Sequence, residues 1–327
     1  MKKNIAIVAG GDSSEYVVSL KSAEGIRSFM DQERYNVYLV LIRKYDWHVI
    51  LPDGGKIPVN KDMFGFYERG QYIQFDFAYI TIHGTPGENG ILQGYFELTG
   101  IPYSSCGVLA SALTFNKYNC SAFLRSFGIR TTSSILLRKG DVVADEEIVA
   151  RLGLPLFVKP NEGGSSFGTT KVKTTEQIKP AIRKALEEEG NGVLMESFVE
   201  GTEVTCGCYK VKGKEVILPL TEVVPANEFF DYDAKYNGQV EEITPARISG
   251  ELTRIIQQRT SRIYELIDAR GIIRVDYIIP KTLSGDGDPC LLEVNTTPGM
   301  TATSFFPQQV CAAGMEMRDV LTDIIED

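Results

Sequence analysis

The amino-acid sequence predicts an α/β fold that begins with a parallel sheet and extends over two or three domains. An apolar run at residues 4–9 is followed by a glycine pair and then by a helix that extends to about Met30, an order that is typical of a parallel α/β sheet. Further patterns predict strands at 35–42 and 75–84 and a helix at 91–99. The chain has 327 residues, which is too many for one ordinary hydrophobic core.

Composition and charge narrow the class of protein. Hydrophobic residues make up 43% of the chain and charged residues 24%, as in soluble globular proteins. No stretch approaches the ~20 apolar residues of a membrane span, and the apolar run near the N-terminus is too short for a signal peptide. The net charge of −9 argues against a nucleic-acid partner. Of six scattered cysteines only Cys206 and Cys208 lie close together, which favours reduced thiols in a cytoplasmic protein over a metal site.

A short strand near the C-terminus carries two polar side chains on one face. Glu293 and Asn295 are two residues apart on the strand predicted at 290–294, so both point to the same side. A carboxylate and an amide offer the oxygen ligands that Mg²⁺ prefers. Pro298 then ends the strand, and Gly299 has no side chain, so its backbone N–H can approach a reacting group.

A second alternating segment, 271–280, places Arg274 and Asp276 on one face in the same way. The linker T-L-S-G-D-G-D-P between the two segments predicts a hairpin turn. If the strands pair, all four polar side chains gather on one face, a set that suits a transferred phosphoryl group with its metal ions. A surface hairpin with a solvated polar face is the alternative for either strand alone.

Two side chains of the N-terminal unit are candidates for a ligand site at the strand ends. Glu15 lies at the predicted helix start, where an acid attracts a cation or simply stabilises the helix dipole. His83 lies at the carboxyl end of the third strand, where ligands bind in open α/β sheets, although a lone histidine there is more often structural. The flexible loop 84–90 holds one further acid, Glu88.

The middle of the chain offers groups that can bind phosphates. Lys117 lies in a helix predicted at 108–127, and Lys159 ends a strand predicted at 154–160. The loop at 161–168, N-E-G-G-S-S-F-G, can present backbone N–H groups to phosphate oxygens. It matches neither the P-loop nor the G-x-G-x-x-G pattern, and a plain hairpin turn is the alternative.

Two later segments suggest a connector and a lid. Residues 187–209 predict a strand, a break and another strand, and this connector can offer backbone hydrogen bonds to a purine edge, with Glu203 accepting from ribose hydroxyls. A simple inter-domain linker is the alternative. Residues 225–247 lack periodicity and are polar and aromatic, which favours an ordered lid. The amphipathic helix predicted at 250–269 covers the sheet.

The order and spacing of these motifs resemble the D-alanine–D-alanine ligase family of the ATP-grasp superfamily over almost the whole chain. The segments that carry the resemblance are G-G-D-S-S-E-Y-V-V-S-L, I-H-G-T-P-G-E-N-G-I-L-Q-G, V-K-P-N-E-G-G-S-S-F-G, D-Y-D-A-K-Y, R-V-D and L-L-E-V-N-T-T-P-G-M-T. The resemblance implies a three-domain ATP-grasp fold. Its parts are an N-terminal Rossmann-like substrate domain at 1–104, a central subdomain at 105–200, and a C-terminal subdomain at 201–327 with the lid at 225–247.

The resemblance also implies a reaction. ATP phosphorylates the carboxylate of one D-alanine, and the amine of a second D-alanine attacks the acyl phosphate, which supplies D-alanyl-D-alanine for peptidoglycan, the cell wall and cell shape. It implies two Mg²⁺ ions, for which Mn²⁺ substitutes, a cytoplasmic location and a homodimer. The closest rival is a ligase that joins D-alanine to a hydroxy acid such as D-lactate. A rival of another class is a non-catalytic nucleotide-binding regulator.

Residue by residue, the resemblance suggests roles around the nucleotide. The phosphates are bound by two lysines, Lys117 and Lys159. Adenine is held by the connector at Glu196, Phe198 and Val199, and ribose by Glu203. The Mg²⁺ ligands are Asp276, Glu293 and Asn295. Lys235 belongs to the nucleotide site and lies on the lid. Gly163 stands where the family usually has an acid, and Glu162 comes one residue earlier, so the contacts of this loop are open.

The resemblance likewise suggests roles around the substrates. Glu15 and His83 fall in the substrate pocket, Ser304 and Phe305 where the second alanine's carboxylate binds, and Arg274 and the Gly299 N–H at the oxyanion site. Tyr236 is placed against Glu15 and Ser165 when the lid closes. Relatives that make the D-lactate ester carry histidine at the position of Tyr236, and a neutral tyrosine leaves an incoming ammonium unrepelled. We therefore expect a dipeptide product.

Overall fold

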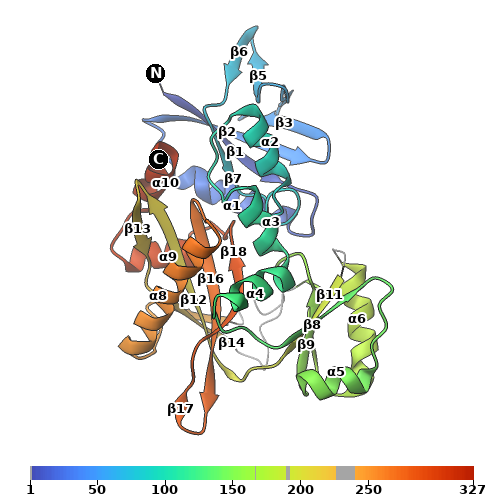
Figure 1. Cartoon of the computed structure of the whole chain (residues 1–327). Helices are drawn as coiled ribbons and strands as arrows, with labels where there is room; N and C mark the ends of the chain where they lie inside the picture. Colours follow the sequence, from blue (N-terminus) through green and yellow to red (C-terminus); the bar gives the residue numbers. More distant parts are fainter. Residues whose placement is uncertain (1, 166, 189–191, 226–239) are drawn as a thin grey trace.

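The protein is built from three sheets, and its computed structural model describes residues 2–165, 167–188, 192–225 and 240–327 (Figure 1). The N-terminal sheet has the strand order β4-β3-β2-β1-β7. Its strands are β1 (Lys3–Gly10), β2 (Tyr35–Arg43), β3 (Asp46–Ile50), β4 (Lys56–Pro58) and β7 (Phe77–Ile80). Because β1 pairs in parallel with both β2 and β7, the predicted parallel α/β sheet is confirmed.

The antiparallel parts of this unit were not predicted. β3 and β4 extend the sheet at one edge by antiparallel pairing. The two-stranded hairpin of β5 (Gly65–Glu68) and β6 (Gln71–Gln74) projects from the end of the molecule (Figure 1).

A four-stranded antiparallel sheet follows, in the order β10-β9-β11-β8. Its strands are β8 (Ser134–Arg138), β9 (Leu156–Pro160), β10 (Thr170–Val172) and β11 (Gly192–Ser197). The helices α5 (Asp145–Leu152) and α6 (Ile178–Glu187) and the short 3₁₀ helix η1 (Thr175–Gln177) accompany it. Side chains of α5 and α6 share one buried cluster with its strands, so this sheet has its own core.

The largest sheet has seven strands and carries the predicted C-terminal hairpin. Its strands are β12 (Gly201–Val211), β13 (Lys214–Ile217), β14 (Thr221–Pro225), β15 (Val240–Ile243), β16 (Ile272–Thr282), β17 (Gly285–Asp286) and β18 (Cys290–Asn295). β16 lies between β12 and β18 and pairs with both in antiparallel fashion. Within the segment predicted as an irregular lid, 225–247, the structure has the strand β15. Residues 226–239 of that segment lie outside the described residues.

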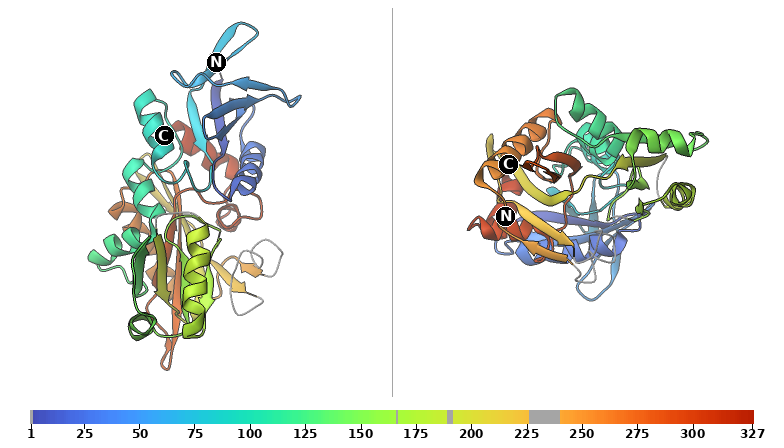
Figure 2. Two further views of the ribbon diagram at one scale, coloured as in Figure 1. Left: turned by 90° about the vertical axis from the view of Figure 1, so that its right-hand side faces the viewer. Right: turned by 90° about the horizontal axis from the view of Figure 1, so that it is seen from below.

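The remaining helices surround the N-terminal and seven-stranded sheets (Figure 2). They are α1 (Tyr16–Phe29), α2 (Ile91–Thr99), α3 (Val108–Phe115), α4 (Lys117–Ser126), α8 (Gly250–Leu266), α9 (Phe305–Ala312) and α10 (Met317–Glu326). None of the helices that the structure describes combines the length and the apolar character that a bilayer crossing needs.

The single helix predicted at 108–127 is wrong, because the structure has two helices, α3 and α4, that meet at Asn116. Asn116 has φ −86° and ψ 95°, and its side-chain oxygen accepts a hydrogen bond from the backbone N–H of Asn119 at 3.0 Å. Asparagine favours such N-cap positions over helix interiors, since its side chain competes for backbone groups. The break places Lys117 at the start of a helix.

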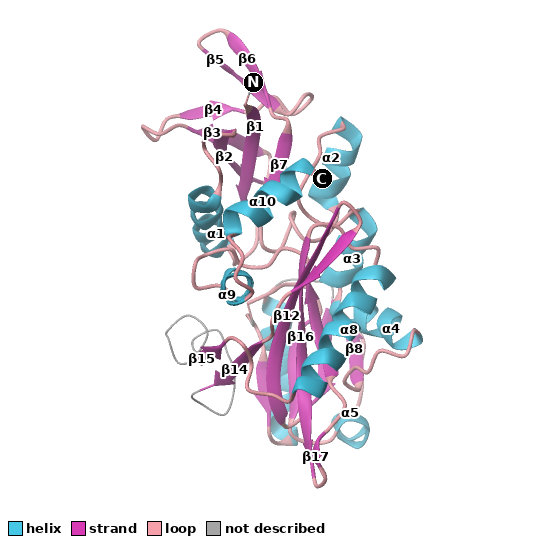
Figure 3. Cartoon of the chain, turned by 90° about the vertical axis from the view of Figure 1, so that its left-hand side faces the viewer, coloured by secondary structure: helices cyan, strands magenta, loops and turns pink. Residues whose placement is uncertain are grey.

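The N-terminal sheet and the C-terminal helices share one core. Ile5 and Ile7 of β1 belong to the same buried cluster as Val320 and Ile324 of α10 and Phe306 of α9. α10 lies beside α1 at the N-terminal sheet (Figure 3). The two ends of the chain are thereby packed together, which holds the N-terminal sheet against the seven-stranded sheet.

Candidate active site

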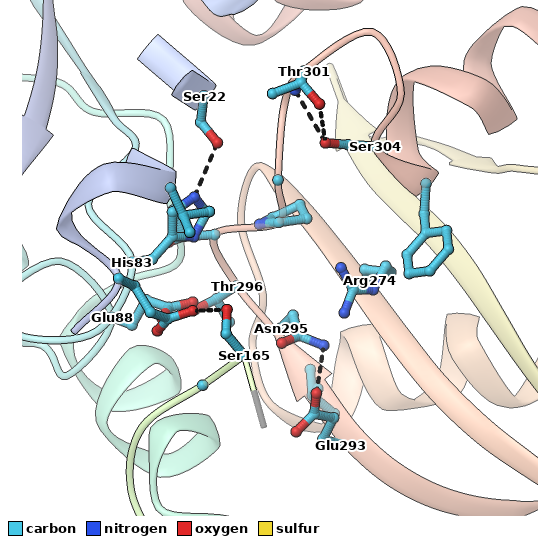
Figure 4. Close-up of a pocket in the computed structure, with 18 of the residues that line it drawn as sticks. Ser22, His83, Glu88, Ser165, Arg274, Glu293, Asn295, Thr296, Thr301 and Ser304 are labelled. Carbon is cyan, nitrogen blue, oxygen red and sulfur yellow. Dashed lines mark hydrogen bonds between the residues drawn. The ribbon is translucent and has the colours of Figure 1, made fainter. Parts of the chain in front are cut away.

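The three sheets meet at a cavity of about 560 Å³. It is lined from the N-terminal unit, from α4 and the loop after β9, from β16 and β18, and from the loop and helix that follow β18 (Figure 4). Ten of the predicted site residues line this cavity: Glu15, His83, Lys117, Ser165, Arg274, Glu293, Asn295, Gly299, Ser304 and Phe305. Segments that are far apart in the sequence therefore converge on one site.

The pairing of β16 with β18 brings the four polar residues of the two strands together, as predicted. Arg274 lies opposite Asn295, and Asp276 lies opposite Glu293. The Arg274 guanidinium donates two hydrogen bonds to the Asp276 carboxylate, from Nε at 2.9 Å and from a terminal nitrogen at 2.8 Å. Thr205 Oγ1 donates to the same carboxylate at 2.5 Å, and Asn295 Nδ2 at 3.1 Å.

The Arg274–Asp276 pair is almost fully buried, with 8% and 7% of the two residues exposed. Burial alone would lower the pKa of Arg274, but the charges of Asp276 and Glu293 and the bonds to Asp276 outweigh it and raise that pKa above its ordinary value. Arg274 is thus a permanent cation at the cavity wall. Its guanidinium carbon also lies 5.2 Å from the centre of the Phe305 ring, within the range of a cation–π contact.

The start of α9 and the loop before it form the far wall of the cavity. Ser304 is the N-cap residue of α9. Its Oγ accepts a hydrogen bond from the backbone N–H of Thr301 at 3.1 Å and lies 2.8 Å from Thr301 Oγ1 (Figure 4). A Cβ on Gly299 would lie 3.0 Å from Ser304 Oγ. Glycine at 299 therefore keeps its backbone N–H close to this hydroxyl cluster and to the cavity.

Glu15 faces the cavity from the start of α1 and is only 5% exposed. Ser165 Oγ donates a hydrogen bond to its carboxylate across 150 residues of sequence. A Cβ on Gly164 would lie 2.6 Å from Glu15 Oε2, so glycine is needed for the loop to approach so closely. Glu15 is thus a buried carboxylate that is paired with Ser165 at the start of α1.

His83 is buried at the end of the N-terminal sheet. Its Nε2 lies 3.0 Å from Ser22 Oγ, and Ser22 stands on α1 (Figure 4). The backbone carbonyl of His83 accepts a hydrogen bond from Ser13 Oγ at 2.8 Å. These contacts fix both the ring and the backbone at the cavity.

Glu88, which sequence reasoning noted without giving it a role, also lines the cavity. Its Oε2 accepts a hydrogen bond from the Gly84 backbone N–H at 2.7 Å. Burial and the charge of Glu15 raise the pKa of Glu88 from 4.5 to about 8, against the opposing effects of Gly84 and Lys117. The sequence feature that could have identified Glu88 as a site residue is its position in the loop that directly follows His83.

The loop at 161–168, called the serine loop below, shows why an acid stands at 162 and a glycine at 163. Gly163 has φ +103°, a region that side chains rarely adopt, and its carbonyl accepts a hydrogen bond from Lys117 Nζ. Glu162 Oε1 accepts from Asn116 Nδ2 at 3.0 Å. The acid thus anchors the loop to the start of α4, and the glycine turns the chain towards Lys117. The Ser165 backbone has φ +49°.

Of the residues predicted for the nucleotide and its metal, Lys117, Glu293 and Asn295 line this cavity, whereas Lys159, the connector residues and Glu203 do not. Lys159 forms a salt bridge with Glu196 across β9 and β11. Burial alone would lower the pKa of Lys159, but Glu196 and Glu293 outweigh it and raise that pKa. Phe198 has the ammonium of Lys171 3.9 Å above its ring centre.

Val199 follows Phe198 between β11 and β12, and Glu203 stands on β12. These residues and Asp276 do not line the 560 Å³ cavity. Lys235 and Tyr236 lie outside the described residues.

Lys21, Glu242 and Gln308 are among the cavity residues that were not singled out from the sequence. Gln308 Nε2 donates to Glu242 Oε2 at 2.5 Å and to the Thr303 carbonyl at 2.7 Å. The bond to Glu242 joins α9 to β15. Lys21 lies on α1, and its exposed position resembled an ordinary solvated helix face. Glu242 and Gln308 become recognisable only when β15 and α9 are placed in space.

Oxygen ligands for a metal are present at β16 and β18. No three histidine, cysteine, aspartate or glutamate side chains among the described residues converge as a metal cluster. The predicted set instead combines the carboxylates of Asp276 and Glu293 with the amide of Asn295, whose Nδ2 lies 3.5 Å from Glu293 Oε1. Two carboxylates and an amide oxygen match the preference of Mg²⁺ for oxygen, so the residues fit that ion.

The three sheets and the cavity between them define the chain as an ATP-grasp protein, and the comparisons with known proteins specify the family. Residues 4–106 match the family model described as D-ala D-ala ligase N-terminus, and residues 123–326 match the model of the D-ala D-ala ligase C-terminus. The chain belongs to the D-alanine–D-alanine ligase family.

Individual relatives support this assignment. A D-alanine--D-alanine ligase of Parabacteroides distasonis is 66% identical over 327 residues, covering 100% of this chain and 98% of its own length. The VanG D-Ala:D-Ser ligase of Enterococcus faecalis has a TM-score of 0.86 at 32% identity, with coverage of 100% and 99%. A D-alanine--D-alanine ligase of Bacillus anthracis complexed with ATP has a TM-score of 0.76 at 28% identity, with coverage of 99% and 96%.

Proposed function

We propose that the protein joins two D-alanine molecules to D-alanyl-D-alanine in an ATP-dependent, ADP-forming reaction, for peptidoglycan precursor synthesis in the cytoplasm. The observation that carries the proposal is the single cavity into which Glu15, Ser165, Arg274 and Gly299 all project from different parts of the fold. An ammonium site, a permanent cation and a backbone donor are thus gathered where two amino acids would have to meet. The names of the relatives agree with this function.

In the first step a carboxylate oxygen of one D-alanine attacks the terminal phosphorus of ATP, and ADP leaves. Lys117 and Lys159 bind the phosphates, and the connector at Glu196, Phe198 and Val199 holds the adenine. Glu203 accepts hydrogen bonds from the ribose. Asp276, Glu293 and Asn295 would hold a pair of Mg²⁺ ions, or Mn²⁺ in their place, and the bound ions would neutralise phosphate charge.

In the second step the amine of the other D-alanine attacks the carbonyl carbon of the acyl phosphate and loses a proton. The single bond between that carbon and the phosphate oxygen breaks, and inorganic phosphate leaves with its electron pair. Arg274 and the Gly299 N–H stabilise the oxyanion that forms in between. Glu15 binds the ammonium of the first D-alanine, held in place by Ser165, and His83 completes that pocket. Ser304 and Phe305 bind the carboxylate of the second.

The domain organisation follows the same reasoning. We infer three units at 1–104, 105–200 and 201–327; the separate core of the four-stranded sheet supports the central unit. We also infer a homodimer. Ile91, Val108 and Leu109 are 62%, 42% and 78% exposed at the junction of α2 and α3, and a second copy of this chain would bury such an apolar surface.

Phosphate release from ATP tests the function. We expect release only in the presence of D-alanine, with D-alanyl-D-alanine identified by mass spectrometry, and Arg274→Lys should abolish most of it because the bidentate fork is lost. Lys281→Gln, at the exposed end of β16, is the matched control and should be silent. Binding of an ATP analogue without D-alanine-dependent release would indicate the non-catalytic regulator instead.

Competition between acceptors tests the choice of the second substrate. D-alanine, D-serine and D-lactate are supplied together at neutral pH, and we expect mainly the D-alanine dipeptide. A D-Ala:D-Ser ligase among the structural neighbours makes D-serine the relevant alternative amine. A mixture dominated by D-alanyl-D-lactate or D-alanyl-D-serine would refute the proposed acceptor.

A further inference from the structure

A second, much smaller cavity lies directly behind the wall of the active-site cavity. It has a volume of about 10 Å³, roughly that of one water-sized sphere. Thr296, Thr297 and Pro298 line both cavities, so the loop that follows β18 is the partition between them. Gly299, the proposed oxyanion donor, is the next residue of this loop.

Two buried hydroxyl groups at the small cavity have no hydrogen-bond partner within the described part of the chain. They are Thr81 Oγ1, in a residue that is 1% exposed, and Thr297 Oγ1, in a residue that is 6% exposed. Thr81 follows the N-terminal strand β7, whereas Thr297 belongs to the loop after β18, so the two hydroxyls come from different sheets. An unpaired buried hydroxyl destabilises the folded state, and two of them around one small cavity indicate a common partner.

The rest of Thr81 is already satisfied. Its backbone N–H donates to the Val8 carbonyl at 2.9 Å, and its carbonyl accepts from Ser19 Oγ at 2.7 Å. Only the hydroxyl is left over. A water molecule matches both the volume and the need for a group that accepts and donates hydrogen bonds, because buried waters characteristically bridge such unsatisfied groups.

We propose that Thr81 and Thr297 hold one buried water molecule that fixes the Thr296–Gly299 loop against the N-terminal sheet. The water bridges two sheets at the point where the loop turns towards the cavity, and it thereby positions the Gly299 backbone N–H. Thr81 and Thr297 act as positioning residues, since their hydroxyls bind the water and act on the Gly299 N–H through the loop. The water site stands on geometry alone, while its consequence for turnover rests on the proposed function.

The sign of a stability change tests the site. If the water is present, Thr81→Val removes one of its partners and should lower Tm by on the order of 2 °C. If the two hydroxyls have no partner, the same substitution removes an unsatisfied polar group and should raise Tm. Thr81→Ser keeps the hydroxyl and should restore the Tm. A rise in Tm for Thr81→Val and for Thr297→Val overturns the proposal.

Hydrogen exchange tests the effect on the loop without using activity. We expect the amides of residues 296–300 to exchange roughly fivefold faster in Thr81→Val, as for the loss of one net hydrogen bond. Thr260→Val is the control: Thr260 Oγ1 is 2.9 Å from Tyr277 Oη in another core, so it should lower Tm without changing exchange at 296–300. Unchanged exchange in Thr81→Val refutes the positioning role.

A high-resolution crystal structure and kinetics complete the test. The electron density should show one water within hydrogen-bond distance of both hydroxyls, and its absence refutes the site. With D-alanine and ATP, Thr81→Val should lower kcat severalfold and leave the KM for ATP unchanged, because neither Thr81 nor Thr297 is among the residues proposed to bind ATP. If the exchange and Tm results hold but no D-alanine-dependent turnover exists in the unmodified protein, the proposed function fails and the water site stands.

Discussion

Replacing Glu88 by glutamine should remove a pH-dependent destabilisation of the folded protein. The Glu88 carboxyl is half-buried in the loop after His83, and its Oε2 accepts a hydrogen bond from the Gly84 N–H at 2.7 Å. Burial and the neighbouring carboxylate of Glu15 raise its pKa from 4.5 to about 8. Glutamine keeps the shape and the accepting oxygen but carries no ionisable proton.

The sign and size of the effect follow from linkage. Between pH 4.5 and about 8 the folded protein retains a proton on Glu88 that the unfolded chain has lost, so the contribution of this group to stability falls as the pH rises through that window. The shift corresponds to an upper bound of roughly 5 kcal/mol. Since the side chain is half-buried and water screens it, we expect about 1–3 kcal/mol.

Urea denaturation of the unliganded protein at several pH values measures this effect. Glu88→Gln and the unmodified protein should have similar free energies of unfolding near pH 4.5, the ordinary pKa, and the variant should gain by about 1–3 kcal/mol as the pH passes about 8. Glu24→Gln, on the exposed side of α1, is the control and should leave the difference flat. A difference that does not grow with pH, or a variant that becomes the less stable protein at high pH, contradicts the reasoning.

Four further substitutions test other parts of the protein. Glu293→Gln should leave the urea midpoint nearly unchanged and lower turnover on the order of 100-fold, because phosphoryl transfer loses an anionic metal ligand; near-normal activity at millimolar Mg²⁺ would disprove the metal assignment. Gly163→Ala should lower the free energy of unfolding by about 1–2 kcal/mol, because Gly163 has a φ of +103°. Gly94→Ala, in open space on α2, should raise it by about 0.5–1 kcal/mol. If urea denaturation showed the two free energies changing in the same direction, this reasoning would be contradicted. Leu109→Glu should shift the mass measured by light scattering from dimer to monomer, and an unchanged mass would exclude this surface.

The local sequence pattern was sufficient to predict a strand or helix wherever the alternation of side chains and the pairing partner are set by neighbouring residues. The alternation in β16 and β18 placed Arg274 and Asp276 opposite Asn295 and Glu293 because the hairpin between them leaves one natural pairing. The parallel N-terminal sheet was recognisable from strands that alternate with glycine turns and helices. The helix at 91–99 has the predicted bounds, since Gly90 and Gly100 flank it.

Side-chain contacts, the charges around a group and one helix break were beyond the reach of such patterns. Asp276 was expected to bind a metal. In the structure its carboxylate accepts two hydrogen bonds from Arg274, and this contact depends on the direction of two side chains on one strand. The raised pKa of Glu88 arises from Glu15 and from burial, and neither is visible in the loop itself. The break at Asn116 was missed because the apolar pattern of 108–127 continues through it, while the asparagine cap ends the helix.

The way the sheets are joined determines which parts of the site are held firmly. The N-terminal and seven-stranded sheets share one core that runs from Ile5 to Ile325, so Glu15 and Arg274 belong to one packed body. The buried core of the four-stranded sheet, in contrast, contains only residues between Ile135 and Met195. Ser165, in the loop of that sheet, donates a hydrogen bond to the Glu15 carboxylate. The position of the serine loop relative to the substrate pocket therefore depends on a few polar contacts, and these are the contacts that substrate charge is able to strengthen or replace.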